Sequence, residues 1–273
     1  MMPVPTPRMT RRHPILGLLA ATLMLAASPA PPPATGEALP RGTALLQRFI
    51  RAVGGEAAIR DVQSMSARGR ISLPGTTETG RFDWAVADGG RCIFDMNFPN
   101  LGRSRFGSNG TIGWESLQLD DETTVQRLDA AVVERRRRHA NWFELALTLP
   151  ARARSFETIG KSTFDNTPSY EVRMIDERGG IHHLFFDAQT QLLLGVRLIE
   201  RGPLGPADVT IRFGEWKPVD RLTLFHQVNI DHADVHMRLQ FEHVSLKDVP
   251  PERFAPPESV ITTPSSPVDS PDA

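Results

Sequence analysis

Apolar positions along most of the chain recur at every second residue, which is the spacing of a β-strand with one buried face. Phe82 and Trp84 share one face of such a stretch, whereas Arg81 and Asp83 share the other. The alternation continues in the next stretch through Cys92, Phe94, Met96 and Phe98. The Asp-Gly-Gly sequence at 88–90 between the two stretches predicts a turn, so we expect a pair of antiparallel strands here.

Further strands are expected near residues 102–107, 110–116, 153–163, 168–176, 180–187, 191–200, 206–216, 221–231 and 234–246. Helical spacing occurs at only two places, residues 42–53 with a turn at 56–60, and residues 127–149 with Asp129 as a candidate N-cap. Because crossover helices between strands are missing, the pattern favours a mainly β (α+β) fold, a curved antiparallel sheet or an open barrel. The pattern alone does not distinguish a barrel from a sandwich.

The first 30 residues are typical of a secretory signal peptide, which directs export to the periplasm. Arg8, Arg11 and Arg12 precede an apolar run at 15–27, which is shorter than the roughly 20 residues of a transmembrane helix. An uncleaved N-terminal anchor is the alternative. We expect a flexible leader at 31–41, a folded domain at 42–257 and a disordered, Pro/Ser-rich tail at 258–273.

The charge of the chain makes some functions less favoured. The chain holds 31 Lys and Arg against 32 Asp and Glu. When the three arginines of the predicted signal peptide are left out, the net charge of the remaining chain is mildly negative, which argues against a nucleic-acid binder.

Cys92 is the single cysteine, so no internal disulfide forms, and we expect it to be a small buried side chain. The four arginines at 135–138 cover most of a helical turn, and a solvated helix face is favoured over a contact with anionic lipid or an acidic partner.

No catalytic signature is present: the chain lacks a phosphate-binding glycine loop, a nucleophile elbow and a His-Glu-x-x-His motif. We therefore expect no enzyme activity and no cofactor. The C-terminal strands contain His182, His183, His226, His232, His236 and His243. A metal site is not expected, because His226 shares its face with apolar residues and His236 shares its face with polar ones. A metal-dependent enzyme is the least favoured alternative.

The aromatic and large apolar positions of the N-terminal strands are the candidate binding surface. Six of them, Phe82, Trp84, Phe94, Met96, Phe98 and Trp114, are predicted to line a hydrophobic cavity. The apolar segment around Trp142, Phe143 and Leu145 is predicted to cover this cavity as a lid. In a closed sandwich the same residues would be ordinary core.

Several short segments resemble the LolA-like family of outer-membrane lipoprotein-sorting proteins in their order and spacing. They are residues 52–55 (AVGG), 58–59 (AI), 62–65 (VQSM), 109–114 (NGTIGW), 185–193 (FFDAQTQLL) and 251–257 (PERFAPP). The resemblance covers roughly residues 42–257. It implies an incomplete antiparallel β-barrel, a half-barrel whose concave face is covered by helices.

The resemblance also implies a function, that of a monomeric, non-enzymatic periplasmic carrier that shelters a lipid or lipoprotein acyl chain. The alternative is an envelope sensor or scaffold that uses the same fold to bind a protein partner, such as an envelope membrane protein.

Overall fold

The structure is a computed structural model, which describes residues 38–148, 153–177, 179–202, 205–232 and 235–262. The chain divides into two units, residues 1–38 and 39–273, and all the described helices and strands belong to the second. The predicted signal peptide, the leader up to residue 37 and the tail from residue 263 lie outside the described residues.

Thirteen strands form one sheet in which every neighbouring pair is antiparallel, in the order β6-β5-β4-β3-β2-β1-β15-β14-β11-β10-β9-β8-β7. The strands are β1 (Ser64–Ser72), β2 (Thr79–Ala87), β3 (Arg91–Phe98), β4 (Gly102–Asn109), β5 (Gly113–Leu119), β6 (Glu122–Leu128), β7 (Ser155–Phe164), β8 (Thr167–Ile175), β9 (Ile181–Asp187), β10 (Leu193–Gly202), β11 (Gly205–Gly214), β14 (Gln227–His232) and β15 (Val235–Ser245). A separate hairpin consists of β12 (Lys217–Val219) and β13 (Leu222–Leu224).

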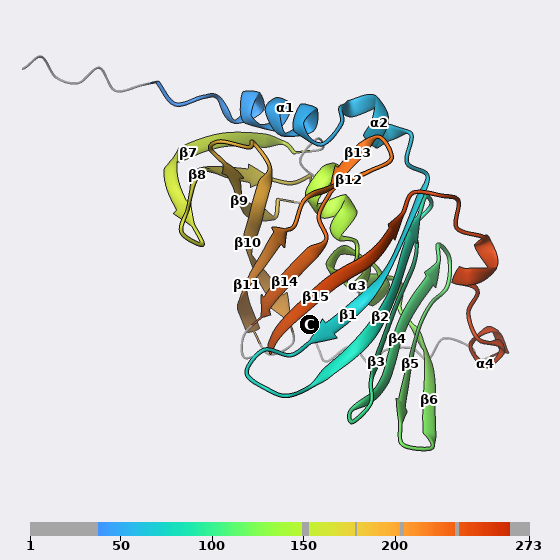
Figure 1. Cartoon of the computed structure of the whole chain (residues 1–273). Helices are drawn as coiled ribbons and strands as arrows, with labels where there is room; N and C mark the ends of the chain where they lie inside the picture. Colours follow the sequence, from blue (N-terminus) through green and yellow to red (C-terminus); the bar gives the residue numbers. More distant parts are fainter. Residues whose placement is uncertain (1–37, 149–152, 178, 203–204, 233–234, 263–273) are drawn as a thin grey trace, which may run out of the picture. The chain divides into compact units, whose positions relative to one another are not determined.

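The sheet curves without closing, since β6 and β7 are its two edges (Figure 1). The helical segments are α1 (Gly42–Ala52), α2 (Glu56–Arg60), α3 (Ala130–Ala140), the π-helix η1 (Glu144–Thr148), the 3₁₀-helix η3 (Pro251–Phe254) and α4 (Glu258–Thr262). The sheet bends around α3, and we call the face towards α3 and η1 concave. The predicted fold class, a mainly β, incomplete antiparallel barrel with helices on the concave face, is confirmed.

Two apolar clusters occupy the two faces of the sheet. The larger one contains the inward side chains of nearly every strand together with residues of α1 and η1. The smaller cluster lies on the convex face of β2–β5, where Phe254 of η3 and Val260 of α4 pack against Ile93 and Trp114. The C-terminal segment therefore covers part of the convex face, and α4 lies where the sequence predicted a disordered tail.

Two glycines, Gly54 and Gly55, follow the end of α1. The backbone N–H groups of Gly54 and Gly55 donate to the carbonyl oxygens of Arg51 and Ile50. Both glycines have positive φ, 124° and 92°, which residues with a side chain rarely adopt. A Cβ on Gly54 would also lie 2.4 Å from the backbone oxygen of Arg221. These glycines turn the chain from α1 into α2 and the start of β1.

Strand β6 and the segment at 221–231 also differ from the sequence prediction. Strand β6 was not predicted, because its residues are almost all exposed and show no alternation of apolar and polar positions. The single strand expected at 221–231 is split into β13 and β14, and the intervening His226 donates its backbone N–H to the carbonyl oxygen of Gly214 at 3.0 Å.

Candidate functional site

Strands β2 and β3 place most of the predicted cavity residues side by side on the concave face. Trp84 pairs with Phe94 across the two strands, and Phe82 pairs with Met96. Phe82, Trp84 and Phe94 are buried, and Phe98 belongs to the same cluster with 9% of its surface exposed. Met96 is partly buried against it. The structure thus brings five of the six predicted cavity residues together on one surface.

Trp114, the sixth predicted cavity residue, lies on the convex face and not with the other five. It pairs with Gly107 of β4, and a Cβ on that glycine would lie 2.5 Å from the Trp114 ring. The guanidinium of Arg105 lies 5.3 Å from the centre of the Trp114 ring, on the same face. Trp114 is therefore buried in the smaller cluster, beneath the C-terminal segment.

Trp142, predicted to be part of a lid, inserts its ring among aromatic side chains of the sheet. Its ring centre lies 5.6 Å from that of Trp84, 5.2 Å from that of Phe94 and 6.2 Å from that of Phe241 on β15. We call Trp84, Phe94 and Phe241 the aromatic cage. Trp142 is 1% exposed, and its indole N–H has no hydrogen-bond partner among the described residues.

The other predicted lid residues extend this contact. Phe143 is buried and belongs to the main cluster, as do Ala146 and Leu147. The side chain of Leu145 lies outside the described residues. The 141–147 segment thus fills the concave face in front of β2 and β3. We call this segment the plug, because the residues expected to form a lid lie within the apolar surface.

A polar network fixes the base of this plug to α3. The Arg137 guanidinium donates to the carboxylates of Glu134 at 3.1 Å and Glu144 at 2.5 Å. The Asn141 side chain donates to the Glu144 carboxylate at 3.0 Å and accepts the backbone N–H of Glu144 at the same distance. Burial lowers the pKa of Arg137, but the bond to Glu134 and the charge of Glu144 outweigh it and leave the pKa raised. We call these four residues the Arg137 network.

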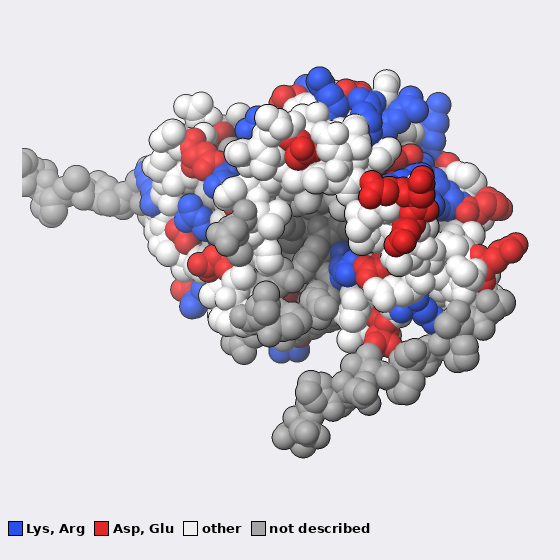
Figure 2. All heavy atoms as spheres, turned by 90° about the horizontal axis from the view of Figure 1, so that it is seen from below, with Lys and Arg blue, Asp and Glu red and all other residues white. Residues whose placement is uncertain are grey.

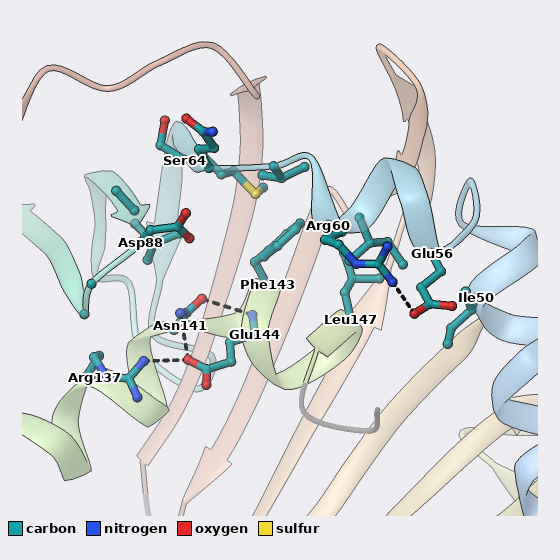
Figure 3. Close-up of a pocket in the computed structure, with 18 of the residues that line it drawn as sticks. Ile50, Glu56, Arg60, Ser64, Asp88, Arg137, Asn141, Phe143, Glu144 and Leu147 are labelled. Carbon is teal, nitrogen blue, oxygen red and sulfur yellow. Dashed lines mark hydrogen bonds and ion pairs between the residues drawn. The ribbon is translucent and has the colours of Figure 1, made fainter. Parts of the chain in front are cut away.

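Beside the plug lies a pocket of about 660 Å³, to which four segments distant in sequence contribute (Figure 3). They are the end of α1 with α2, the start of β1, the β2–β3 turn and the α3–η1 segment. Its apolar lining includes Ile59, Met65 and Val86, and its polar lining includes the Arg137 network. We call it the upper pocket, because the segments that line it meet at the α2 end of the sheet, uppermost in Figure 1.

The opposite end of the sheet, where the β1–β2, β5–β6 and β14–β15 connections lie, carries exposed large apolar side chains. They include Leu117 and Leu119 on β5, Ile199 on β10 and Val235 on β15, which are 43–65% exposed. Seen from this end, the surface is hollowed near its middle (Figure 2).

Three of the candidate histidines bond carboxylates, and Cys92 is buried. Cys92 is buried as predicted, and burial raises the pKa of its thiol to about 12. His182, His183 and His236 each bond a carboxylate, of Asp176, Glu171 and Asp231. Within the described ranges no three His, Cys, Asp or Glu side chains are placed to hold a metal ion.

The arginine run at 135–138 is not a uniformly solvated helix face. Arg136 pairs with Glu115 on the concave side of β5, and Arg137 is only 19% exposed. The side chains of the two flanking arginines lie outside the described residues. Among the helices that the structure describes, none is long and apolar enough to cross a membrane.

No family model matches the chain, and no match to a curated protein was found. Solved structures do match it. A LolA superfamily protein from Nitrosomonas europaea gives a TM-score of 0.49 at 11% identity, covering 80% of this chain and 98% of that one. A DUF1329 family protein from Desulfovibrio piger gives 0.49 at 12% identity, with coverages of 75% and 92%. A domain provisionally described as an outer membrane lipoprotein-sorting protein, from Vibrio parahaemolyticus, gives 0.44 at 12%, with coverages of 74% and 91%.

The expected resemblance is therefore met by structural matches to LolA superfamily and lipoprotein-sorting proteins, at low sequence identity. Such scores and identities describe a similarity of fold and carry no argument about function. The site has to be interpreted from its own residues.

Sequence reasoning missed two parts of this site. Phe241 completes the aromatic cage from a strand more than 140 residues distant from Phe94, and only the pairing of β1 with β15 brings it there. The Arg137 network was not predicted either. Its Glu134–Arg137 pair has the i, i+3 spacing that a helix allows, but the Arg137–Glu144 contact depends on how the chain leaves α3 at Asn141.

Proposed function

We propose that the chain is a non-enzymatic periplasmic carrier, which shelters a lipid or lipoprotein acyl chain on the concave face of the half-barrel. The observation that supports this proposal best is the position of Trp142. An aromatic side chain from a helical segment, not from the sheet, covers the strand-borne aromatic cage. In the proposed mechanism the 141–147 segment withdraws and an acyl chain takes the place of the Trp142 ring.

The free energy lost when the Trp142 ring leaves the cage and the free energy gained when an acyl chain is buried there are of similar size. Removing a large aromatic side chain from a core costs about 3–5 kcal/mol. Burying hydrocarbon yields about 0.8 kcal/mol per methylene, so about four to six buried methylenes offset the loss of Trp142. The indole N–H has no partner among the described residues, and a buried donor of this kind costs about 1–3 kcal/mol, which reduces the free energy needed to withdraw the ring. An acyl chain that buries more methylenes than this would therefore bind with a net gain in free energy and could still be released.

The proposal does not involve catalysis. The side chains around the cage are hydrocarbon and aromatic, and Cys92 beneath α3 keeps its proton. The expectation of no enzyme activity and no cofactor stays a prediction. The same holds for the periplasmic location, for the monomeric state and for the alternative of a protein partner, which no feature of the site favours over an acyl chain.

The test is native mass spectrometry of the full-length protein, purified gently from the envelope of its own host. We expect a lipid-sized mass on the protein, and after its removal a change of tryptophan fluorescence when a fatty acid is added. Recovery of a lipid-free protein whose fluorescence does not respond to any added lipid would contradict the proposal.

A further inference from the structure

We infer that the convex face of strands β15 and β1–β4 docks onto an anionic lipid surface, and that its arginines bind the phosphate groups of the lipid heads. The aromatic cage lies on the opposite, concave face of the same strands. The inference therefore goes beyond the proposed function, because this contact needs no acyl chain in the cage.

The five neighbouring strands β15 and β1–β4 carry an excess of positive charge. They contain seven arginines, which we call the convex arginine patch, namely Arg68, Arg70, Arg81, Arg91, Arg103, Arg105 and Arg238. They contain only three acidic residues, Asp83, Asp95 and Glu242. The whole chain is nearly balanced, with 31 Lys and Arg against 32 Asp and Glu, so this part of the sheet differs in charge from the rest.

The patch lies on the face opposite the main apolar cluster. On β2, the exposed Arg81 and Asp83 alternate with the buried Phe82 and Trp84 of the concave face. In Figure 2, Lys and Arg side chains gather at the upper right, over the strands that face the viewer in Figure 1. Because neighbouring strands are about 4.8 Å apart, the five strands span about 20 Å, which is wide enough to meet several lipid head groups.

The strand register places arginines of the patch next to one another. Arg70 lies directly opposite Arg81, and the same row continues through Asn97 to Arg103. Like charges directly opposite each other on paired strands destabilise a sheet, so the stability of the fold does not account for this row. A surface of phosphates does account for it, because each planar guanidinium can bind a phosphate through two parallel N–H groups.

The carboxylates of this face do not neutralise the row. Glu242 is shared by Arg70 at 3.1 Å and Arg81 at 2.8 Å, and the side chains of these arginines remain 68% and 59% exposed. Asp95 is likewise shared by the two arginines of β4, and Asp83 pairs with an arginine of η3. Two guanidinium groups on one carboxylate leave a positive charge and N–H donors at the surface.

Two arginines of the patch, Arg68 on β1 and Arg238 on β15, form no ion pair with any carboxylate in the part of the chain that the structure describes. Both residues are exposed. Substituting them therefore removes positive charge from the convex face without breaking an ion pair of the fold.

The patch fits a lipid surface better than a protein partner. Among the described residues with exposed large apolar side chains, only Val235 belongs to these five strands, and it lies at the start of β15. Stable protein interfaces depend on a cluster of aromatic or apolar anchors, which the patch does not present. A lipid surface needs no such cluster, because each arginine near anionic head groups strengthens binding about fivefold.

The test is co-sedimentation of the protein, purified from the envelope of its own host, with two kinds of vesicle. One kind contains phosphatidylcholine alone, and the other contains phosphatidylcholine with about one third phosphatidylglycerol, which adds phosphate groups of net negative charge. We expect at least tenfold stronger binding to the anionic vesicles at low salt, and we expect 0.5 M NaCl to remove most of this difference, since salt screens exposed charges.

The variant Arg68→Gln with Arg238→Gln should bind the anionic vesicles about twentyfold more weakly than the wild type. Arg68→Lys with Arg238→Lys keeps both charges and should retain most of the binding. The matched control is Arg48→Gln with Arg51→Gln, which removes two exposed arginines from α1 and should bind like the wild type.

Equal binding of the wild type to the two kinds of vesicle would overturn the inference, whatever the variants do. So would equal losses in the two glutamine variants, because binding would then follow total charge and not the convex face. Neither result affects the carrier proposal, which is tested by the lipid bound to the protein and by its tryptophan fluorescence.

Discussion

Replacing Trp142 by alanine removes the ring that lies within the aromatic cage. The side chain is 1% exposed, and aromatic side chains of this size bury about 150–250 Å². Large aromatic-to-alanine changes in cores cost about 3–5 kcal/mol. Because the variant also removes a buried N–H that has no partner in the part of the chain that the structure describes, we expect the lower end of this range, about 3 kcal/mol of unfolding free energy.

The assay is equilibrium unfolding in urea, monitored by circular dichroism so that the loss of one tryptophan does not disturb the signal. Trp142→Phe is the matched control, since it keeps a ring in the cage and removes the unpaired N–H. We expect it to lose less than about 1.5 kcal/mol. Added indole should restore part of the stability of the alanine variant, about 2.7 kcal/mol at a hundredfold excess over its dissociation constant.

The alanine and phenylalanine variants together make the reasoning refutable. A loss below about 1 kcal/mol in Trp142→Ala would mean that the ring is not packed as described. Equal losses in the two variants would mean that a phenyl ring in the cage contributes no stability, so that ring packing does not explain the loss. Failure of indole to restore stability would show that the cage collapses when it is empty, which would weaken the idea that an acyl chain replaces the ring.

Three further predictions concern other parts of the fold. Since burial raises the pKa of Cys92 to about 12, a thiol-disulfide reagent at pH 8 should not label the folded protein, and prompt labelling without denaturant would contradict its placement. Burial raises the pKa of Asp231, but the hydrogen bonds from His236 and an arginine outweigh it and leave the pKa lowered. Its stabilising effect is therefore present at neutral pH and is lost as the pH falls through the folded-state pKa. Asp231→Asn should therefore lower Tm at pH 7, and the difference from the wild type should shrink as the pH falls through that pKa; a constant difference would argue against this. Gly113→Ala would place a Cβ 2.0 Å from a methyl carbon of Val133, so we expect a loss of about 1–3 kcal/mol in urea unfolding and look for an unchanged midpoint as the opposing result.

The strands that could be predicted from the sequence are those with one buried face. Strand β2 alternates strictly from Gly80 to Trp84, and its burial follows that alternation because one face meets the main cluster. The sequence of β6 does not alternate in this way, because only Val125 and Leu128 are apolar. The strand is an exposed edge of the sheet. Its existence depends on pairing with β5, which is a tertiary property.

In the candidate site, too, some residues could be placed from the sequence and others could not. Phe82, Trp84 and Phe94 could be assigned to one surface because their spacing within and across neighbouring strands fixes their face. Trp114 could not, because its face depends on the register of β4 with β5 and on the C-terminal segment that packs over it. The apolar residues of the 142–147 segment were enough to predict that this segment covers an apolar surface. Whether it lies above the aromatic cage or within it depends on packing that the pattern does not contain.

The central claim is that an acyl chain reaches the concave face beneath Trp142. Two single-tryptophan variants test it, one that keeps only Trp84 and one that keeps only Trp114, with phenylalanine at the other tryptophan positions. Both side chains are at most 1% exposed, but they lie on opposite faces of the sheet. Titration with a brominated fatty acid should quench the fluorescence of Trp84 and leave that of Trp114 unchanged. Equal quenching of both, or quenching of Trp114 alone, would contradict the account.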